Sequence, residues 1–307
     1  MPERKSVLVK VPATTANLGP GFDCLGLALD IWNEVTFSIS GSSLIIDIEG
    51  EGSDLLPRDS SNLIYRCMQT LAAQAAHNLP NGLQIRCKNR VPVASGLGSS
   101  SSAVIAGLLG AKSLLNLQIS DYDLLKTALT FEGHSDNTAA CLFGGLTITV
   151  FSESELIIKK IAIKPINAVI ALPEVTLSTH QSRAALPETV HMKNAVFNIG
   201  RTALLINALQ ESNYDYLKFA MQDSLHQPFR MHLIPGAEAA ISAAMGAGAL
   251  GAALSGAGPG IIAFLANGNP KIGDSMTRAF NQAEISSRIF STTSTNQSAN
   301  TKIKISI

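Results

Sequence analysis

The sequence has no excess of charge of either sign and few aromatic residues. It holds 23 Lys and Arg against 23 Asp and Glu in 307 residues, and aromatic side chains make up 5%. Proteins that bind nucleic acids usually carry a basic surface, and those that bind single strands add aromatic rings on which bases stack. Neither pattern occurs here, so the sequence predicts no nucleic-acid partner.

Cysteine is also scarce. The four cysteines (Cys24, Cys67, Cys87 and Cys141) lie far apart and form no Cys-x-x-Cys pair. This scatter favours reduced thiols in a cytosolic protein over a disulfide framework. The first residues contain no apolar segment of the kind found in secretory signals. We therefore expect a cytoplasmic protein.

One stretch without charge could be mistaken for a membrane span. From Ala239 to Ala266 no residue is charged, but the stretch is rich in Gly and Ala and contains a Pro. It divides into a helix-like half and a strand-like half. The pattern predicts a buried helix, loop and strand, and no membrane partner.

Strand-like and helix-like segments alternate along both halves of the chain. A length of 307 residues suggests about two domains. The polar stretch 152–155 marks the predicted boundary, which divides the chain into domains 1–154 and 155–307. The mixture of elements indicates an α/β or α+β class. Segments with alternating or continuous apolar residues predict strands at 35–40, 43–50, 83–89, 146–151, 156–163, 167–173 and 260–266.

Three further predictions concern the second half of the chain. The segment 215–225 has a helical pattern and should end before Pro228. The segment 286–300 is polar enough to be a mobile loop. The last six residues alternate Lys and Ile, which predicts a closing strand.

A loop rich in glycine and serine precedes a helical pattern in the segment "VPVASGLGSSSSA", which starts at Val91. Gly96 and Gly98 allow positive φ angles and close approach of a ligand to the backbone. The serines at 99–102 can cap the helix, and its first turn offers free N–H groups and a partial positive charge. Together these features predict a phosphate site. A flexible loop whose serines only cap the helix is the alternative, and no Walker A lysine follows.

This segment resembles the phosphate loop of the GHMP kinases, Pro-x-x-x-Gly-Leu-Gly-Ser-Ser. Three more segments agree in order and spacing with motifs of the family's homoserine kinase branch: "VKVPATTANLGPGFDCLGLALD", "EGHSDNTAACLFGG" and "GAALSGAGPGIIAF". In the second of them Ser135 stands where the branch usually has Pro. The likeness spans Val11 to Phe264, and four ordered motifs are far more specific than one glycine-rich loop.

The resemblance implies an α+β fold with an N-terminal nucleotide domain of ribosomal-protein-S5 type and a ferredoxin-like C-terminal domain. It also implies transfer of the γ-phosphate of ATP, with Mg²⁺, to the side-chain hydroxyl of L-homoserine, a step of threonine biosynthesis. A homodimer is one assembly compatible with the sequence. Two rival functions are a kinase for mevalonate-type substrates and a non-catalytic regulator that binds ATP.

The resemblance assigns nucleotide contacts to the glycine-rich loop. Asn62, in "SNLIYRC", matches a family position near the base. The loop residues expected to bind the phosphates are Pro92, Val93, Ala94, Ser95, Gly96, Leu97, Gly98, Ser99, Ser100, Ser101 and Ser102. Mg²⁺ takes oxygen ligands, and the family pattern gives this role to Ser100 and Glu132, although Ser99 is hard to separate from Ser100.

Three predicted catalytic residues lie in the "EGHSDNTAACLFGG" segment. Besides Glu132, these are Asp136, the natural candidate for a base that takes the hydroxyl proton, and Asn137, which lies near the reacting atoms in the homoserine kinase branch. A loose phosphoryl-transfer transition state needs little proton removal until late. Both residues are therefore kept, and we expect direct transfer without a covalent intermediate.

An amino-acid substrate needs an anionic partner for its ammonium group and cationic partners for its carboxylate. Asp23 is predicted to bind the ammonium group, while Arg has the planar fork that binds carboxylates. The substrate-binding residues implied by the motifs are Asn17, Asp23, His134, Thr179, Arg183 and Arg230. Ser255, Gly256, Ala257 and Gly258 are expected to support the phosphate loop; a plain helix-to-strand turn is the alternative for them.

Overall fold

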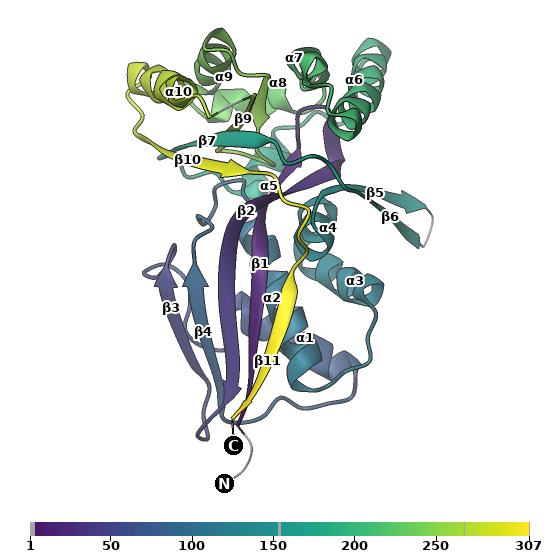
Figure 1. Ribbon diagram of the computed structural model, residues 1–307, viewed down its shortest axis with the longest axis vertical. Coiled ribbons are helices and arrows are strands. Elements are labelled where there is room, and N and C mark those ends of the chain that lie inside the picture. The colour runs from purple at the N-terminus through teal and green to yellow at the C-terminus, as the bar shows by residue number, and fades with distance from the viewer. Residues whose placement is uncertain (1–3, 153–154, 267, 307) are drawn as a thin grey trace.

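Two β-sheets organise the chain (Figure 1). The computed structural model describes residues 4–152, 155–266 and 268–306. Helices and strands occur in both halves and are largely segregated within each of them. The α+β class predicted from the sequence is therefore confirmed.

The first sheet is built around a long antiparallel pair of strands, β1 and β2. Its order is β11-β1-β2-β4-β3, with β5 paired to β2 and β6 paired to β5. The strands are β1 (Arg4–Asn17), β2 (Gly21–Ile39), β3 (Ile45–Gly50), β4 (Leu83–Asn89), β5 (Leu146–Ser152), β6 (Glu155–Ile161) and β11 (Asn300–Ser306). Alternate residues of β1, such as Val7 and Val9, are fully buried, as expected for a strand with one face on a core.

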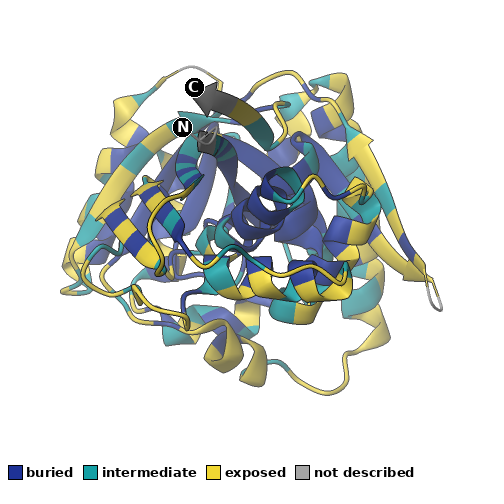
Figure 2. Cartoon of the chain, turned by 90° about the horizontal axis from the view of Figure 1, so that it is seen from below, coloured by how far each residue is buried: buried dark blue, intermediate teal, exposed yellow. Residues whose placement is uncertain are grey.

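Four helices cover that face of the first sheet. They are α1 (Leu63–Gln74), α2 (Ser99–Leu114), α3 (Asp121–Glu132) and α4 (Asp136–Phe143). Helix α2 is buried along most of its length and packs directly on β1. Figure 2 shows this buried helix inside a shell of exposed segments. The N-terminus of α4 lies against β2, where a Cβ on Gly26 would come within 2.1 Å of the Asp136 carbonyl oxygen.

The second sheet is antiparallel with the order β10-β7-β9-β8. Its strands are β7 (Asn167–Pro173), β8 (Gly251–Leu254), β9 (Ile261–Leu265) and β10 (Ser287–Thr293). The helices of this half are α5 (Thr179–Ala184), α6 (Met192–Glu211), α7 (Leu217–Ala220), α8 (Gln227–Arg230), α9 (Ala237–Gly246) and α10 (Pro270–Gln282). Helices α9 and α10 share one apolar core with one face of the sheet.

A separate apolar core joins the two sheets. Leu25 and Leu27 from β2 pack in it with Ile170 of β7, Phe264 of β9 and Leu209 of α6. Because residues of both sheets share this core, the end of the β1–β2 hairpin is fixed against the second half of the chain. The residues between β1 and β2 are thereby held at the junction of the two halves.

The helix predicted over 215–225 is wrong in extent. The structure has a 3₁₀ turn at Tyr214–Tyr216, the four-residue helix α7, and then a turn. The carboxylate of Asp223 accepts hydrogen bonds from the N–H groups of Leu225, His226 and Gln227. These bonds end the preceding turn and begin α8, so Pro228 lies in the first turn of a helix instead of after one.

The loop predicted over 286–300 is also wrong. Its first half forms β10, which pairs with β7 from Ser287 to Thr293. This strand lies at the edge of the sheet and is only partly buried, so backbone hydrogen bonds order it although its side chains are polar. The loop was predicted from the polar composition of the segment, which reflects the exposure of its side chains but not the pairing of its backbone with β7.

The predicted domain boundary after residue 154 lies outside the described residues. Both β6 and β11 belong to the first sheet, so the chain passes to the second sheet only between β6 and β7 and returns after β10. The division into domains 1–154 and 155–307 stays a prediction. If each strand is assigned to the domain of its sheet, β6 belongs to the first domain and the boundary lies after Ile161.

Two predictions based on absences can be compared with the structure. The uncharged stretch Ala239–Ala266 forms most of α9 followed by β8 and β9, which are largely buried. In the described part of the chain, no helix has the length and apolar character needed to cross a membrane.

All four cysteines are free thiols. A cytoplasmic location and a homodimer stay predictions.

Candidate active site

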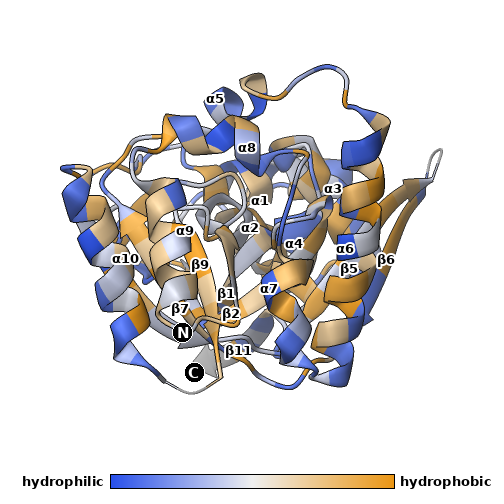
Figure 3. Ribbon diagram, turned by 90° about the horizontal axis from the view of Figure 1, so that it is seen from above, coloured by the Kyte–Doolittle hydropathy of each residue, from blue (hydrophilic) through white to orange (hydrophobic). Residues whose placement is uncertain are grey.

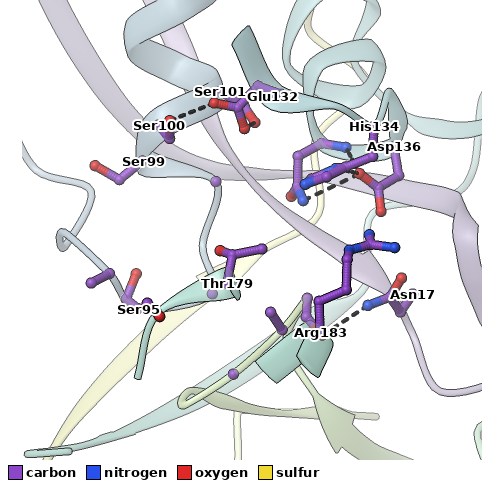
Figure 4. A pocket seen from close by; sticks show the side chains of 18 of the residues that line it. Asn17, Ser95, Ser99, Ser100, Ser101, Glu132, His134, Asp136, Thr179 and Arg183 are labelled. Atoms are coloured by element: carbon purple, nitrogen blue, oxygen red, sulfur yellow. Dashed lines mark hydrogen bonds and ion pairs between the residues drawn. The ribbon is translucent and has the colours of Figure 1, made fainter. Parts of the chain in front are cut away.

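A pocket lies where the two halves of the chain meet, between the start of α2, the start of α4 and helix α5. It is lined by Asn17, Asp23, Ala94, Ser95, Gly96, Gly98, Ser99, Ser100, Ser101, Glu132, His134, Asp136, Asn137, Leu177, Ser178, Thr179, Arg183, Arg230, Gly256, Ala257 and Gly258. Figure 4 shows serines and Glu132 on one side of it, with His134, Asp136 and Arg183 on the other. The pocket thus brings together six separate segments of the sequence: 17–23, 94–101, 132–137, 177–183, Arg230 and 256–258.

The glycine-rich loop has the backbone geometry that its sequence predicts. Gly96 and Gly98 have φ angles of +78° and +68°. A Cβ on Gly96 would lie 2.2 Å from the Ser255 carbonyl oxygen, and one on Gly98 would lie 2.0 Å from Oγ1 of Thr14. Both positions therefore exclude a side chain for conformational and for steric reasons.

The first turn of α2 offers free backbone N–H groups at the pocket. The N–H of Ser102 bonds to the Gly98 carbonyl group over 2.8 Å and begins the helical pattern. The N–H groups of Ser99, Ser100 and Ser101 precede that first bond and have no partner within the helix. They lie at the positive end of the helix dipole, which favours an anionic ligand.

The segment 255–260 braces this loop from the second half of the chain. Oγ of Ser255 donates to the Gly96 carbonyl group over 2.7 Å, and the N–H of Gly260 donates to the Ser95 carbonyl group over 3.1 Å. The N–H of Gly256 bonds in turn to the Ala16 carbonyl group of β1. These contacts favour the loop-support role predicted for Ser255–Gly258.

Glu132 lies beside the serines of α2. Oγ of Ser100 donates to one carboxylate oxygen of Glu132, and Oγ of Ser101 donates to the other over 2.9 Å. No hydrogen bond joins Ser99 to Glu132, so this geometry favours Ser100 over Ser99 as the partner of the carboxylate. The group combines a carboxylate with hydroxyls, which are the oxygen donors that Mg²⁺ prefers.

Asp136 and its neighbours form a buried polar group at the start of α4. Nδ1 of His134 donates to Oδ1 of Asp136 over 2.6 Å, and the N–H of Asn137 donates to the same oxygen over 2.7 Å. Burial by itself lowers the pKa of His134, but the hydrogen bond to Asp136 and the charges of Asp136, Glu132 and Asp23 raise it above its ordinary value. His134 therefore favours the protonated form that binds Asp136.

The turn between β1 and β2 presents Asp23 to the pocket. Asn17, Leu18 and Asp23 all have positive φ angles, which makes this turn unusually tight for residues other than glycine. Oδ1 of Asn17 accepts from the N–H of Asp23 over 3.0 Å, and its Nδ2 donates to the Gly256 carbonyl group over 2.8 Å. Asn17 is thus held by protein groups and itself holds Asp23.

Asp23 and Arg183 are paired to each other. Both guanidinium Nη atoms donate to the two carboxylate oxygens, each over 2.9 Å. The hydrogen bond to Asp23 raises the pKa of Arg183, against the effect of partial burial. The sequence predicts separate partners for these two side chains, an ammonium group for Asp23 and a carboxylate for Arg183, and the structure shows that they can also neutralise one another.

Arg230 is a buried cation without a carboxylate partner. It is 2% exposed, its Nε donates to the Ser182 carbonyl group over 3.2 Å, and its Nη1 lies 3.2 Å from Nδ1 of His226. Across the described ranges no acidic side chain lies within ion-pairing distance of it. Burial, and then the charge of Arg183, lower the pKa of Arg230 to about 10, so it still carries its charge at neutral pH.

A second cavity, of about 380 Å³, adjoins the phosphate loop. Asn62 lines it, as does Ser102, and the N-cap side chain of Asn62 accepts from the N–H of Ile64. Its apolar lining residues include Val11, Val35, Ile48, Leu56, Leu63, Ile64, Cys87 and Val93. A largely apolar cavity next to an anion site suits the planar base of a nucleotide.

Every predicted catalytic and substrate-binding residue lines the main pocket, but three predicted loop residues line neither cavity. Leu97 is fully buried in the core between the sheets. Pro92 is buried and its carbonyl group accepts from Oγ of Ser95, while Ser255 is buried under the loop. Pro92 and Leu97 lie behind the loop because it turns these two apolar side chains toward the core, whereas Ser255 braces the loop through its hydroxyl group.

Sequence reasoning missed three residues behind the pocket: Thr14, Phe22 and His226. Thr14 donates to Asn137, while Phe22 and His226 stack on each other. Phe22 directly precedes Asp23 and His226 lies one helical turn before Arg230, so proximity in the sequence was an available signal for both. No such signal was available for Thr14, because its hydrogen-bond partner Asn137 lies 123 residues away in the sequence.

Comparisons with known proteins agree with this geometry. The family model described as GHMP kinases N terminal domain matches residues 62–145, and the one described as GHMP kinases C terminal matches residues 200–282. The homoserine kinase of Moorella thermoacetica is 42% identical over 274 residues, which is 89% of this chain and 92% of that protein. The homoserine kinase of Carboxydothermus hydrogenoformans is 41% identical over 262 residues, 85% of this chain and 86% of that protein.

Solved structures show the same fold. A homoserine kinase from Cytophaga hutchinsonii superposes with a TM-score of 0.84 at 31% identity, and 97% of each chain is covered. The mevalonate kinase of L. major, solved with R-mevalonate, has a TM-score of 0.70 at 18% identity over 95% of each chain, a likeness that concerns the fold alone. Family models over most of both halves, relatives above 40% identity and a shared fold lead to one conclusion: the chain belongs to the GHMP kinase family.

Proposed function

We propose that this chain transfers the γ-phosphoryl group of ATP to the side-chain hydroxyl of L-homoserine and so makes O-phospho-L-homoserine for threonine biosynthesis. The relatives that match it over most of its length are named homoserine kinase. The observation in the pocket that carries the proposal is Arg230, a buried guanidinium with no carboxylate partner among the described residues.

An unpaired buried cation is costly unless a ligand supplies the missing negative charge. Arg230 borders the pocket next to Asp23 and Arg183, so a carboxylate beside a primary ammonium group would satisfy all three side chains. The ammonium group would take Asp23, and the carboxylate would bridge Arg230 and Arg183. A zwitterionic amino acid therefore fits this arrangement better than a substrate with a carboxylate alone.

The nucleotide would occupy both cavities. Its base would lie in the apolar cavity beside Asn62, and its phosphates would lie along the N–H groups at the start of α2. This placement directs the terminal phosphate toward Glu132, Asp136 and Asn137, which border the same pocket.

The donor set beside the phosphate loop fits Mg²⁺. Glu132 and the hydroxyls of Ser100 and Ser101 are hard oxygen donors, already joined by hydrogen bonds. In residues 4–152, 155–266 and 268–306, no three or more His, Cys, Asp or Glu side chains are arranged so that they could hold a metal ion by themselves, so phosphate and water would supply the other ligands. Mg²⁺ usually binds in this way, through one or two carboxylates, phosphates and water, and when bound it neutralises phosphate charge.

In the reaction the homoserine hydroxyl oxygen bonds to the γ-phosphorus as the bond from that phosphorus to the β–γ bridging oxygen breaks, which releases ADP. The hydroxyl proton passes to Asp136 or to water. Oδ1 of Asp136 already accepts from His134 and Asn137, so Oδ2 is the oxygen available to it. Nδ2 of Asn137 would donate to the transferring group. This transfer needs positioning and charge neutralisation, and no covalent intermediate.

A substrate panel tests the proposal. Release of ADP from Mg-ATP would be measured with L-homoserine, mevalonate and galactose. Turnover with homoserine alone supports the proposal, turnover with mevalonate favours the mevalonate-type alternative, and turnover with none favours a regulator. Homoserine lacking its amino group is a sharper control, because Asp23 would then have no ammonium group to bind, only its ion pair with Arg183, and the rate should fall.

A further inference from the structure

His226 is enclosed between Arg230 and the turn that joins β1 to β2. Its side chain has no exposed surface. Its Nδ1 lies 3.2 Å from Nη1 of Arg230, and its Nε2 lies 2.7 Å from the carbonyl oxygen of Gly19. One imidazole ring therefore links the buried guanidinium to the segment that presents Asp23. Figure 3 shows α8, which carries Arg230, next to α5.

The two neighbours of the ring determine where its proton lies. A guanidinium can only donate hydrogen bonds, so Nδ1 must accept from Arg230 and carries no proton. A carbonyl oxygen can only accept, so Nε2 carries the proton and donates it to Gly19. An imidazolium would direct a second N–H group at the N–H of Arg230. The ring is therefore neutral and in the Nε2–H form.

Asp223 does not compete for that proton. Its nearest oxygen lies 3.6 Å from Nε2, well beyond the 2.7 Å to Gly19. Both of its oxygens already accept other hydrogen bonds, from Nδ2 of Asn198 and from the N–H groups of Leu225, His226 and Gln227. The carboxylate is thus used to begin α8 and fixes the backbone of His226.

The charges around the ring agree with a neutral imidazole. Burial lowers the pKa of His226, and the nearby charge of Arg230 lowers it further, while Asp223, Asp23 and the hydrogen bond to Gly19 oppose the shift. The net direction is downward from the ordinary value of about 6.5. Neutrality at physiological pH therefore follows from the electrostatics as well as from the hydrogen-bond geometry.

Phe22 extends the same arrangement to both arginines. Its ring stacks on that of His226 with centroids 5.1 Å apart and an angle of 24° between the planes. The guanidinium carbons of Arg230 and Arg183 lie 5.1 Å and 5.5 Å from the centroid of the Phe22 ring. Since guanidinium groups are attracted to aromatic faces at such distances, the ring pair fixes the plane in which both arginines meet a ligand.

We infer that His226 is a positioning residue for substrate recognition: its neutral Nε2–H form supplies the acceptor that orients Arg230 toward the substrate carboxylate, while its proton ties Arg230 to the turn that carries Asp23. The inference rests on the function proposed above. It assigns to His226 no contact with the substrate. The effect of changing it should therefore appear in the binding of the amino acid and not in the binding of ATP.

Two isosteric substitutions separate the two hydrogen bonds. In His226→Asn the amide oxygen can occupy the position of Nδ1 and still accept from Arg230. In His226→Gln the amide nitrogen can occupy the position of Nε2 and still donate to Gly19, but Arg230 loses its acceptor. We expect His226→Gln to raise the KM for homoserine about tenfold or more, and His226→Asn to stay within about threefold of the unmodified enzyme. In both variants kcat and the KM for ATP should change by less than about threefold.

His232→Asn is the matched control, because this histidine is exposed and lies two residues beyond Arg230. Thermal unfolding of each variant reports any loss of stability separately. Equal increases of the KM for homoserine in His226→Asn and His226→Gln would overturn the inference. So would a lower Tm with no change in either KM, which would leave His226 a structural role alone.

The ring nitrogens can be examined without any substrate. In protein labelled with ¹⁵N-histidine, the signals absent from His226→Asn identify the ring, and their chemical shifts show which nitrogen carries a proton. We expect an unprotonated Nδ1 and a protonated Nε2 at pH 7; a protonated Nδ1 would overturn the inference. If unmodified enzyme fails to phosphorylate homoserine, the proposed function fails, whereas this spectrum still decides the state of His226.

Discussion

Thr14 and Asn137 are joined by a buried hydrogen bond in which the Thr14 hydroxyl donates to Oδ1 of Asn137 over 2.8 Å. Since the oxygen of the amide is thereby fixed, its Nδ2 must point the other way, where it lies 3.4 Å from Oδ1 of Asp136. A residue of β1 thus decides which end of the Asn137 amide faces the reacting groups.

This relationship can be tested with substitutions that keep the shape of Thr14. Thr14→Val removes the hydroxyl and leaves the amide free to rotate, so we expect kcat to fall about tenfold with little change in the KM for ATP. Thr14→Ser keeps the hydroxyl and should retain most of the activity. Steady-state kinetics would check this, and an equal loss in both variants would contradict the assigned orientation.

Arg230→Leu should impair amino-acid binding selectively. Removal of a buried guanidinium that binds a carboxylate should raise the KM for homoserine about 100-fold and leave the KM for ATP within about threefold. Arg278→Leu, at an exposed arginine of α10, is the control. Kinetics with each substrate varied in turn would measure both values. A similar rise in both KM values would place Arg230 in the nucleotide site or in the fold.

Glu132→Gln should change the response to magnesium. The amide keeps the size of the side chain but loses its charge, so we expect a higher Mg²⁺ concentration at half-maximal rate and a kcat lowered about 100-fold. Titration of the rate with Mg²⁺ at fixed ATP would check this, with exposed Glu188→Gln as the control. An unchanged Mg²⁺ response would remove Glu132 from the metal site.

Gly98→Ala should abolish nucleotide binding through a steric clash and not through backbone strain alone. Gly248 also has a positive φ, +95°, but a Cβ there would meet nothing within 4 Å, whereas at Gly98 it would lie 2.0 Å from Oγ1 of Thr14. Gly248→Ala should therefore cost about 1 kcal/mol of stability and keep activity. Calorimetric titration with the magnesium–nucleotide complex would compare them, and normal affinity in Gly98→Ala would be the contrary result.

The raised pKa of His134 predicts a pH-dependent contribution to stability. Because the folded-state pKa lies above the unfolded value of about 6.5, the stabilisation is fully present below that pH and is lost as the pH rises through the folded-state value. His134→Gln should lower Tm most near pH 6 and least near pH 9. Thermal unfolding of both proteins across this range would check it, with exposed His191→Gln as the control. A difference that grows with pH would refute the pairing with Asp136.

Local features of the sequence predicted most of the fold correctly. The strand predicted over 83–89 from alternating apolar residues and the one predicted over 167–173 from a continuous apolar run appear with the same bounds. The failures concern segments whose conformation depends on distant backbone partners. The segment 287–293 consists mostly of polar residues, and it forms a strand because its backbone pairs with the strand β7. The helical pattern over 215–225 was interrupted by three hydrogen bonds to Asp223 that periodicity does not record.

The sequence indicated most of the residues that line the candidate site, but not which side chains contact one another there. Asp23 and Arg183 were each identified by chemical type, but their mutual ion pair joins residues 160 positions apart. Arg230 was expected near the substrate. Its burial and its contact with His226 could not be predicted, because both arise from the packing of α8 against the β1–β2 turn. Motifs identify side chains, whereas orientation comes from tertiary contacts.

The pairing of β11 with β1 has a consequence for biosynthesis. Residues 300–306 form an edge of the sheet on which α2 and its glycine-rich loop are supported, next to the first strand of the chain (Figure 1). While a ribosome is still translating these codons, β1 has that edge open. The first sheet can thus acquire this edge strand only after residues 300–306 have emerged, long after the strands β1 to β6 have been made.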